Sequence, residues 1–198
     1  MIDYTSIPTA DWMNYEAIYD MAADRLKTGD MVVELGVWKG RSITYLMHKL
    51  MEQGKECKIT CVDNFLGASR KYMKTQCAES DHPKIDAIPY NQTHFSQLVF
   101  FLASAGILDK IDIVISESDD ASTAFEDDSV SFCWVDACHY DTSVTRDITA
   151  WWPKIKSGGV ISGHDWHWTG VNKAVKRYFH GVAEIQSYDK QTSWWVEK

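Results

Sequence analysis

Residues 31–42 read Met-Val-Val-Glu-Leu-Gly-Val-Trp-Lys-Gly-Arg-Ser. The first five are apolar apart from Glu34, which is typical of a buried parallel strand. Gly36 and Gly40 then permit a tight turn and a close approach of the backbone to a ligand. A helix is predicted directly after Gly40, and the free N–H groups at its start favour an anion. Because Asp63 ends the next predicted strand, these residues together indicate a nucleoside-type cofactor site.

The rest of the chain alternates predicted strands with predicted helices. Strands are predicted at 31–35, 58–62, 111–115, 130–135 and 160–162, and helices at 14–27, 43–51, 93–105, 141–152 and 171–178. Residues 182–185 and 193–196 suggest an antiparallel edge hairpin. This order predicts an α/β protein of the Rossmann-like, doubly wound type, with a mostly parallel seven-stranded sheet and helices on both faces.

The length of 198 residues fits a single domain over residues 1–198, which we expect to include an N-terminal extension at 1–13. Residues 66–92 carry charges, Pro83 and Pro89, but little periodicity. A loop of this length in a compact domain is usually functional or mobile. We therefore predict a lid or substrate loop there, and a disordered insertion is the alternative.

Composition argues against several classes of protein. The chain carries 20 basic and 28 acidic residues, a net charge of −8 that fits nucleic-acid backbones poorly. It has no apolar run of roughly 18 residues and no signal-peptide pattern, so we expect no membrane segment. The five cysteines form no C-x-x-C pair and are odd in number. Reduced thiols and a cytoplasmic location are expected.

Polar landmarks cluster where the predicted strands end. They are Gly36, Asp63, Ser118, Asp136, His164 and Asp165. In a parallel sheet these ends meet at one edge, where ligands bind at the switch point. The glycine spacing is G-x-x-x-G, neither G-x-G-x-x-G nor a Walker loop. It favours a ligand that carries a small carboxylate instead of a pyrophosphate.

The stretch from Glu34 to Ser42 resembles the first motif of class I S-adenosylmethionine-dependent methyltransferases. Its E-L-G-x-x-x-G-x-S form is similar to that of the catechol O-methyltransferase-like enzymes. Three later segments resemble a related branch that includes macrocin O-methyltransferase-like enzymes and the methyltransferase domain 24 type. They are Val-Asp-Ala-Cys-His-Tyr at 135–140, Trp-Trp-Pro-Lys-Ile-Lys-Ser-Gly-Gly-Val at 151–160, and Gly-His-Asp at 163–165. The resemblance covers roughly residues 30–180, with 66–92 unmatched.

The resemblance implies S-adenosylmethionine as cofactor. The implied cofactor-binding residues are Glu34, Gly36, Trp38, Gly40, Ser42, Asp63, Glu117, Ser118 and Asp136. Glu34 would lie by the methionyl ammonium and Ser42 would bind the methionyl carboxylate. Asp63 suits the ribose hydroxyls, with a helix or turn cap as the alternative. Glu117 and Ser118 would lie by the adenine, or else form a solvated turn.

Asp136 and Asp165 match carboxylates that bind a divalent ion in the metal-dependent branch. His164 stands where catechol-type enzymes carry an aspartate, and imidazole binds zinc, nickel or iron better than magnesium. The implied metal ligands are therefore Asp136, His164 and Asp165, holding Mg²⁺ or another divalent metal. The alternative is that Asp136 and Asp165 bind cofactor and substrate without a metal.

The implied catalytic residues are His139 and Asp136. His139 lies three residues beyond Asp136, where catechol-type enzymes place their basic residue, and histidine can accept a hydroxyl proton near pH 7. A packing or capping role for His139 is the alternative, and His167 is a second candidate base.

We therefore expect a small O-methyltransferase that acts on a hydroxyl of a small molecule or sugar. A homodimer is expected because this family often forms dimers. Three alternatives remain open: a cephalosporin hydroxylase-like, iron-dependent oxygenase, a nucleic-acid methyltransferase, and a cofactor-binding protein without turnover. The charge of −8 and the lack of an N-P-P-Y-type motif count against the second.

Overall fold

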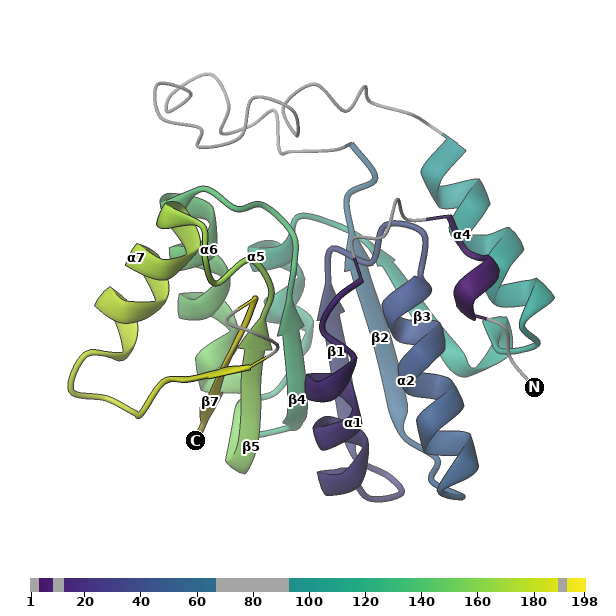
Figure 1. Cartoon of the computed structure of the whole chain (residues 1–198), viewed down its shortest axis with the longest axis horizontal. Helices are drawn as coiled ribbons and strands as arrows, with labels where there is room; N and C mark the ends of the chain where they lie inside the picture. The colour runs from purple at the N-terminus through teal and green to yellow at the C-terminus, as the bar shows by residue number, and fades with distance from the viewer. Residues whose placement is uncertain (1–3, 9–12, 67–92, 189–191) are drawn as a thin grey trace.

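Seven strands form one mixed sheet in the computed structural model, which describes residues 4–8, 13–66, 93–188 and 192–198 (Figure 1). The strand order is β3-β2-β1-β4-β5-β7-β6. Strands β1 to β5 pair in parallel, and β7 is antiparallel to both of its neighbours. The strands are β1 Met31–Leu35, β2 Lys58–Asp63, β3 Ile111–Ile115, β4 Val130–Val135, β5 Ile155–Gly163, β6 Gln186–Tyr188 and β7 Ser193–Glu197. The predicted fold class is confirmed.

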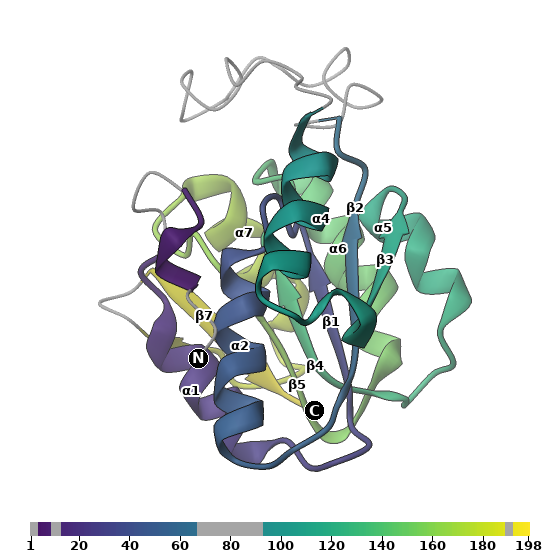
Figure 2. The same cartoon turned by 90° about the vertical axis from the view of Figure 1, so that its right-hand side faces the viewer.

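Helices cover both faces of the sheet (Figures 1 and 2). One face carries α1 Glu16–Arg25, α2 Arg41–Glu52 and α4 Thr93–Ser104, and the other α5 Ser118–Ala121, α6 Asp141–Trp151 and α7 Thr169–Phe179. Short 3₁₀ turns lie at η1 Tyr4–Ser6, η2 Leu108–Lys110, η3 Ser122–Ala124 and η4 Trp152–Lys154.

Successive residues of a strand point to opposite faces, and this alternation divides the core in two. In β1, Val32 packs among the residues of α1 and α2, whereas Val33 and Leu35 pack with those of α6 and α7. The side chain of Glu34 therefore belongs to the α1 and α2 face.

The structure differs from the predicted elements at two strands. β5 begins at Ile155 and not at residue 160, where it was predicted to begin. Its first part was missed because it includes exposed Ser157 and Gly158 and an irregularity in its pairing with β4 after Val130. β6 lies at Gln186–Tyr188 instead of 182–185, since an exposed edge strand needs no apolar run. α5 was not predicted.

Two predicted segments lie largely outside the described residues. Of the predicted lid or substrate loop at 66–92, only Leu66 is described, and of the extension at 1–13, residues 4–8 and 13 are. None of the helices in the described ranges has the length and apolar composition needed to span a membrane.

Candidate functional site

A cavity of about 460 Å³ opens where the parallel strands end. Its walls come from the loops that follow β1, β2, β3, β4 and β5, together with Met13–Tyr15 before α1 and His94 of α4. The predicted site residues that line it are Gly36, Trp38, Gly40, Ser42, Asp63, Glu117, Ser118, Asp136, His139, His164, Asp165 and His167. Of the predicted set, only Glu34 does not line the cavity.

Glu34 lies behind the cavity wall and reaches it through Ser42. Its carboxylate accepts hydrogen bonds from the hydroxyl of Ser42 at 2.5 Å and from that of Tyr19 at 3.0 Å. Burial raises the pKa of Glu34 to about 8, although both hydroxyl bonds act to lower it. Tyr19 was not predicted from the sequence, because a tyrosine on the buried face of a helix is typical of the hydrophobic core.

Asp63 joins the loops after β1 and β2. Its two oxygens accept the backbone N–H of Trp38 at 2.9 Å and that of Phe65 at 2.7 Å. Both of these donors have left-handed backbone, with φ of 47° and 52°. Burial raises the pKa of Asp63, against the effect of the two N–H bonds. The turn-capping role left open for Asp63 is therefore present, and ribose binding by its remaining lone pairs stays a prediction.

Two predicted cofactor positions have left-handed backbone, which favours glycine, and little room for a side chain. Gly36 has φ of 85°, and a Cβ there would lie 2.2 Å from the backbone oxygen of Asp136. Gly40 has φ of 82°, and its Cβ would lie 2.5 Å from Cδ1 of Leu98 in α4. The loop between β1 and α2 is thus shaped by its neighbours, and close approach to a ligand stays a prediction.

The loop after β3 is fastened to α6. The hydroxyl of Ser118 donates to Asp147, and the backbone oxygen of Ser118 accepts from Nε1 of Trp151 at 2.7 Å. Glu117 accepts a hydrogen bond from Asn64 at 3.1 Å. Ser118 is therefore held in place at the cavity wall, which leaves the predicted contact with adenine as a prediction.

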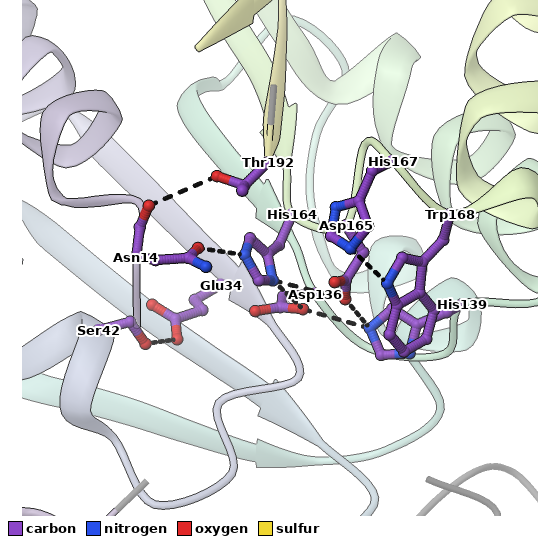
Figure 3. A network of polar contacts seen from close by, with 10 residues as sticks. All are labelled: Asn14, Glu34, Ser42, Asp136, His139, His164, Asp165, His167, Trp168 and Thr192. Carbon is purple, nitrogen blue, oxygen red and sulfur yellow. Dashed lines mark hydrogen bonds and ion pairs between the residues drawn. The ribbon is translucent and has the colours of Figure 1, made fainter. Parts of the chain in front are cut away.

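Two carboxylates and two imidazoles meet at the ends of β4 and β5 (Figure 3). Nε2 of His139 lies 2.9 Å from Oδ2 of Asp165 and 3.4 Å from Oδ1 of Asp136. Nδ1 of His164 lies 3.4 Å and 3.9 Å from the same two oxygens. The carboxylates lie between the two rings, so both imidazoles face one pair of oxygens.

The close charges change the protonation of this cluster. Burial alone would lower the pKa of His139, but hydrogen bonds to Asp136 and Asp165 raise it to about 10. For His164, burial likewise lowers the pKa and Asp165 and Asp136 raise it, with a net increase. Burial raises the pKa of Asp165, yet the two histidines bring it well below its usual range. Without an ion, the imidazole of His139 thus holds its proton at neutral pH.

The donor set fits a divalent metal ion. Asp136, His139 and Asp165 each offer one ligand atom, and these atoms lie within 4.8 Å of one another. The sequence predicted His164 as the third ligand; the structure places His139 in the compact group and His164 farther from both oxygens. Carboxylate and imidazole donors together suit transition metals and zinc better than magnesium.

The segment after Asp165 closes this end of the cavity. Nε1 of Trp168 donates to Nε2 of His167 at 2.8 Å, and the Trp168 ring centroid lies 4.7 Å from that of His139. Asp165 itself has left-handed backbone with φ of 54°. Such a conformation costs about 1–3 kcal/mol in a residue other than glycine, and the surrounding structure must hold it.

The methyltransferase domain family matches residues 33–166 of the chain. Comparison with curated proteins gives no match. Among solved structures, the O-methyltransferase NovP is 15% identical, with 94% of this chain and 80% of that chain covered and a TM-score of 0.75. A calicheamicin methyltransferase, CalS11, is 13% identical, with 92% and 76% covered and a TM-score of 0.62. An rRNA methylase from Streptococcus thermophilus is 12% identical, with 92% and 94% covered and a TM-score of 0.61. At these identities the likeness concerns the fold alone.

Proposed function

This chain belongs to the methyltransferase domain family and is an S-adenosylmethionine-dependent methyltransferase, and on that premise we propose that it methylates a hydroxyl oxygen of a small molecule or sugar with the help of a divalent ion. The main support for the proposal is that the predicted cofactor-binding residues and the acid and histidine cluster line the same cavity. The loop from Gly36 to Gly40 and Asp63 line one part of it, and Asp136, His139 and Asp165 line another.

The first part suits the cofactor. α2 begins at Arg41 after Gly40, which makes no side-chain capping bond, so the first N–H groups of the helix favour the methionyl carboxylate. Ser42 lines the cavity beside them. Its hydroxyl proton is engaged by Glu34, so its oxygen lone pairs suit an ammonium group better than a carboxylate.

The second part suits the hydroxyl that is methylated. Methyl transfer forms a carbon–oxygen bond as the sulfonium carbon–sulfur bond breaks, and the hydroxyl proton must leave. A divalent ion supplies positive charge that lowers the pKa of a hydroxyl. Asp136, His139 and Asp165 would hold it, while His167 and Trp168 line the same end of the cavity.

His139 and Asp136 remain the proposed catalytic residues, with one condition. With its pKa at about 10, the imidazole of His139 is already protonated at pH 7 and cannot accept a second proton. It becomes a proton acceptor only when a cation held by Asp136 and Asp165 replaces that proton and leaves Nε2 of His139 unbound, because a nitrogen that ligates the ion has no lone pair for the substrate proton.

We also propose an acceptor class, a location and an oligomeric state for this protein. A small-molecule or sugar acceptor agrees better with a net charge of −8 than a nucleic acid does. A cytoplasmic location is supported by Cys57, Cys61, Cys133 and Cys138, which are free thiols in the described residues. A homodimer is proposed from the family resemblance.

Calorimetric titration with S-adenosylhomocysteine tests the cofactor part of the proposal. Chelator-treated protein is titrated with and without added Zn²⁺ or Mg²⁺, beside Asp63→Ala and the matched control Asp112→Ala. Asp112 is an exposed carboxylate on β3. We expect micromolar binding that falls at least tenfold in Asp63→Ala and is unchanged in Asp112→Ala. Thermal melting confirms that both variants are folded.

Absence of binding to the unaltered protein under every condition would contradict the proposal. Equal binding by both variants would remove Asp63 from the cofactor site. With binding established, a screen of hydroxyl-bearing small molecules, with S-adenosylhomocysteine release as the readout, tests the acceptor class.

A further inference from the structure

Asn14 contacts the acid and histidine cluster from the segment before α1 (Figure 3). Its side-chain oxygen lies 2.8 Å from Nε2 of His164, and its backbone oxygen accepts from the hydroxyl of Thr192 at 3.4 Å. An amide oxygen only accepts hydrogen bonds, so Nε2 of His164 must carry the proton. The other nitrogen, Nδ1, faces the carboxylates of Asp136 and Asp165.

The aromatic packing around His164 does not decide which nitrogen faces the carboxylates. The ring centroid of Tyr15 lies 4.6 Å from that of His164, and the centroid of Trp134 lies 6.5 Å from it. These aromatic rings fix the plane of the imidazole, but they do not distinguish its two nitrogens. The hydrogen bond to Asn14 on one side and the carboxylate of Asp165 on the other distinguish them.

Nδ1 of His164 is placed to join an ion held by the other three residues. It lies 3.4 Å from Oδ2 of Asp165 and 3.9 Å from Oδ1 of Asp136. The corresponding distances from Nε2 of His139 to the same two oxygens are 2.9 Å and 3.4 Å. Ligand atoms that share one ion at about 2.1 Å lie about 3.0 to 3.4 Å apart when adjacent. His164 is thus about half an ångström farther out than His139 from the same two oxygens.

We propose that Asn14 is a positioning residue that holds Nδ1 of His164 toward the ion, so that two imidazoles and two carboxylates bind a first-row transition metal or zinc in preference to Mg²⁺. Mg²⁺ prefers oxygen ligands and keeps several waters, whereas imidazole suits zinc, iron, nickel and cobalt. Hydrogen bonds that orient metal-binding histidines typically change metal affinity 10- to 100-fold. The inference rests on the divalent ion of the proposed function.

Titration of chelator-treated protein with Co²⁺ or Mg²⁺ tests the inference. The visible spectrum follows Co²⁺, and calorimetry follows both ions. Asn14→Leu removes the acceptor, Asn14→Asp keeps an acceptor oxygen, and Thr192→Val removes the neighbouring contact to the backbone of Asn14 while leaving the Asn14 side chain unchanged. We expect the unaltered protein to bind Co²⁺ at least tenfold more tightly than Mg²⁺. Asn14→Leu should lose about tenfold or more in Co²⁺ affinity and less than twofold in Mg²⁺ affinity, while Asn14→Asp and Thr192→Val keep the preference.

A second measurement reads the ring itself. In ¹⁵N-histidine spectra of the Zn²⁺-loaded protein, Nε2 of His164 should carry its proton and Nδ1 should show the shift of a metal ligand. Asn14→Leu should lose that pattern. This readout remains informative where the visible spectrum of Co²⁺ is weak.

Three outcomes would overturn the inference: equal affinity of the unaltered protein for Co²⁺ and Mg²⁺, no change in Asn14→Leu, or the same loss in Thr192→Val. Titration with S-adenosylhomocysteine separates this failure from that of the proposed function. Binding of S-adenosylhomocysteine without a metal preference leaves the methyltransferase proposal standing and removes only the role of Asn14. Lack of S-adenosylhomocysteine binding to the unaltered protein contradicts the proposed function whatever the metal result.

Discussion

Asp147 shows how one buried carboxyl group can hold a loop of the cavity wall at a cost in stability. One of its oxygens accepts the hydroxyl of Ser118, and the other has no hydrogen-bond partner among the described residues. Burial raises the pKa of Asp147 to about 7, although the bond from Ser118 lowers it. The side chain therefore titrates near neutral pH, far above the usual value of about 3.9 for aspartate.

Asp147→Asn should stabilise the protein at high pH. A pKa raised in the folded state means that stability is highest below about 3.9 and is lost as the pH rises through about 7. Asparagine carries no charge, so the variant escapes this loss. We expect it to be more stable than the parent by about 4 kcal/mol at pH 8 and equal to it near pH 4, as measured by urea denaturation.

Asp112→Asn is the control for that experiment, because Asp112 is exposed. Its stability should follow that of the parent at every pH. If the difference between Asp147→Asn and the parent were the same at pH 4 and pH 8, Asp147 would not be the titrating group.

At the scale of elements, the loop between β1 and α2 is fixed by its fit against the loop after β4. Gly36→Ala would place a Cβ 2.2 Å from the backbone oxygen of Asp136, which cannot move aside as a flexible side chain does. Gly181 has a similar left-handed backbone, with φ of 72°, but no atom of the described residues lies within 4 Å of its Cβ position. The pair separates packing from backbone strain.

We expect Gly36→Ala to cost about 3 kcal/mol or more, and Gly181→Ala about 1 kcal/mol, in free energy of unfolding. Denaturant titration of both variants at one pH measures the difference. Equal costs would show that the loop at Gly36 moves without penalty.

The same elements show what sequence could and could not predict. β1, α2 and β4 were predicted because their apolar patterns, and the glycines that follow β1 and α2, are signals that are local in sequence. The exposed β6 and the glycine-rich start of β5 carry no such period. Strand ends placed Asp136, His164 and Asp165 together, but which imidazole lies closer depends on side-chain geometry. The contact of Asn14 with His164 spans 150 residues and has no local signal.

At the scale of the whole molecule, one sheet brings both parts of the cavity to its switch point. β1 and β4 are neighbours at the centre of the sheet. β2 and then β3 lie beyond β1, and β5 lies beyond β4. In open α/β sheets ligands bind where the strand order reverses. The backbone N–H of Asp136 donates to the carbonyl of Leu35 at 2.9 Å, so the end of β1 and the acid and histidine cluster share one rigid support.

This arrangement makes the stability of the whole domain depend on pH through His139. Its pKa is raised to about 10 in the folded protein, against about 6.5 in an unfolded chain, so the stabilisation is complete below about 6.5 and is lost as the pH rises through about 10. Chelator-treated protein should therefore lose about 3.5 kcal/mol between pH 7 and pH 10 beyond the loss shown by His139→Gln under the same conditions. Urea denaturation at a series of pH values measures both curves.

Saturating Zn²⁺ should flatten the curve of the unaltered protein, because an ion between Asp136 and Asp165 takes over the role of the proton. Parallel curves for the two proteins without metal would show that His139 is not protonated by its carboxylate neighbours, and the condition placed on its role as a base would fall.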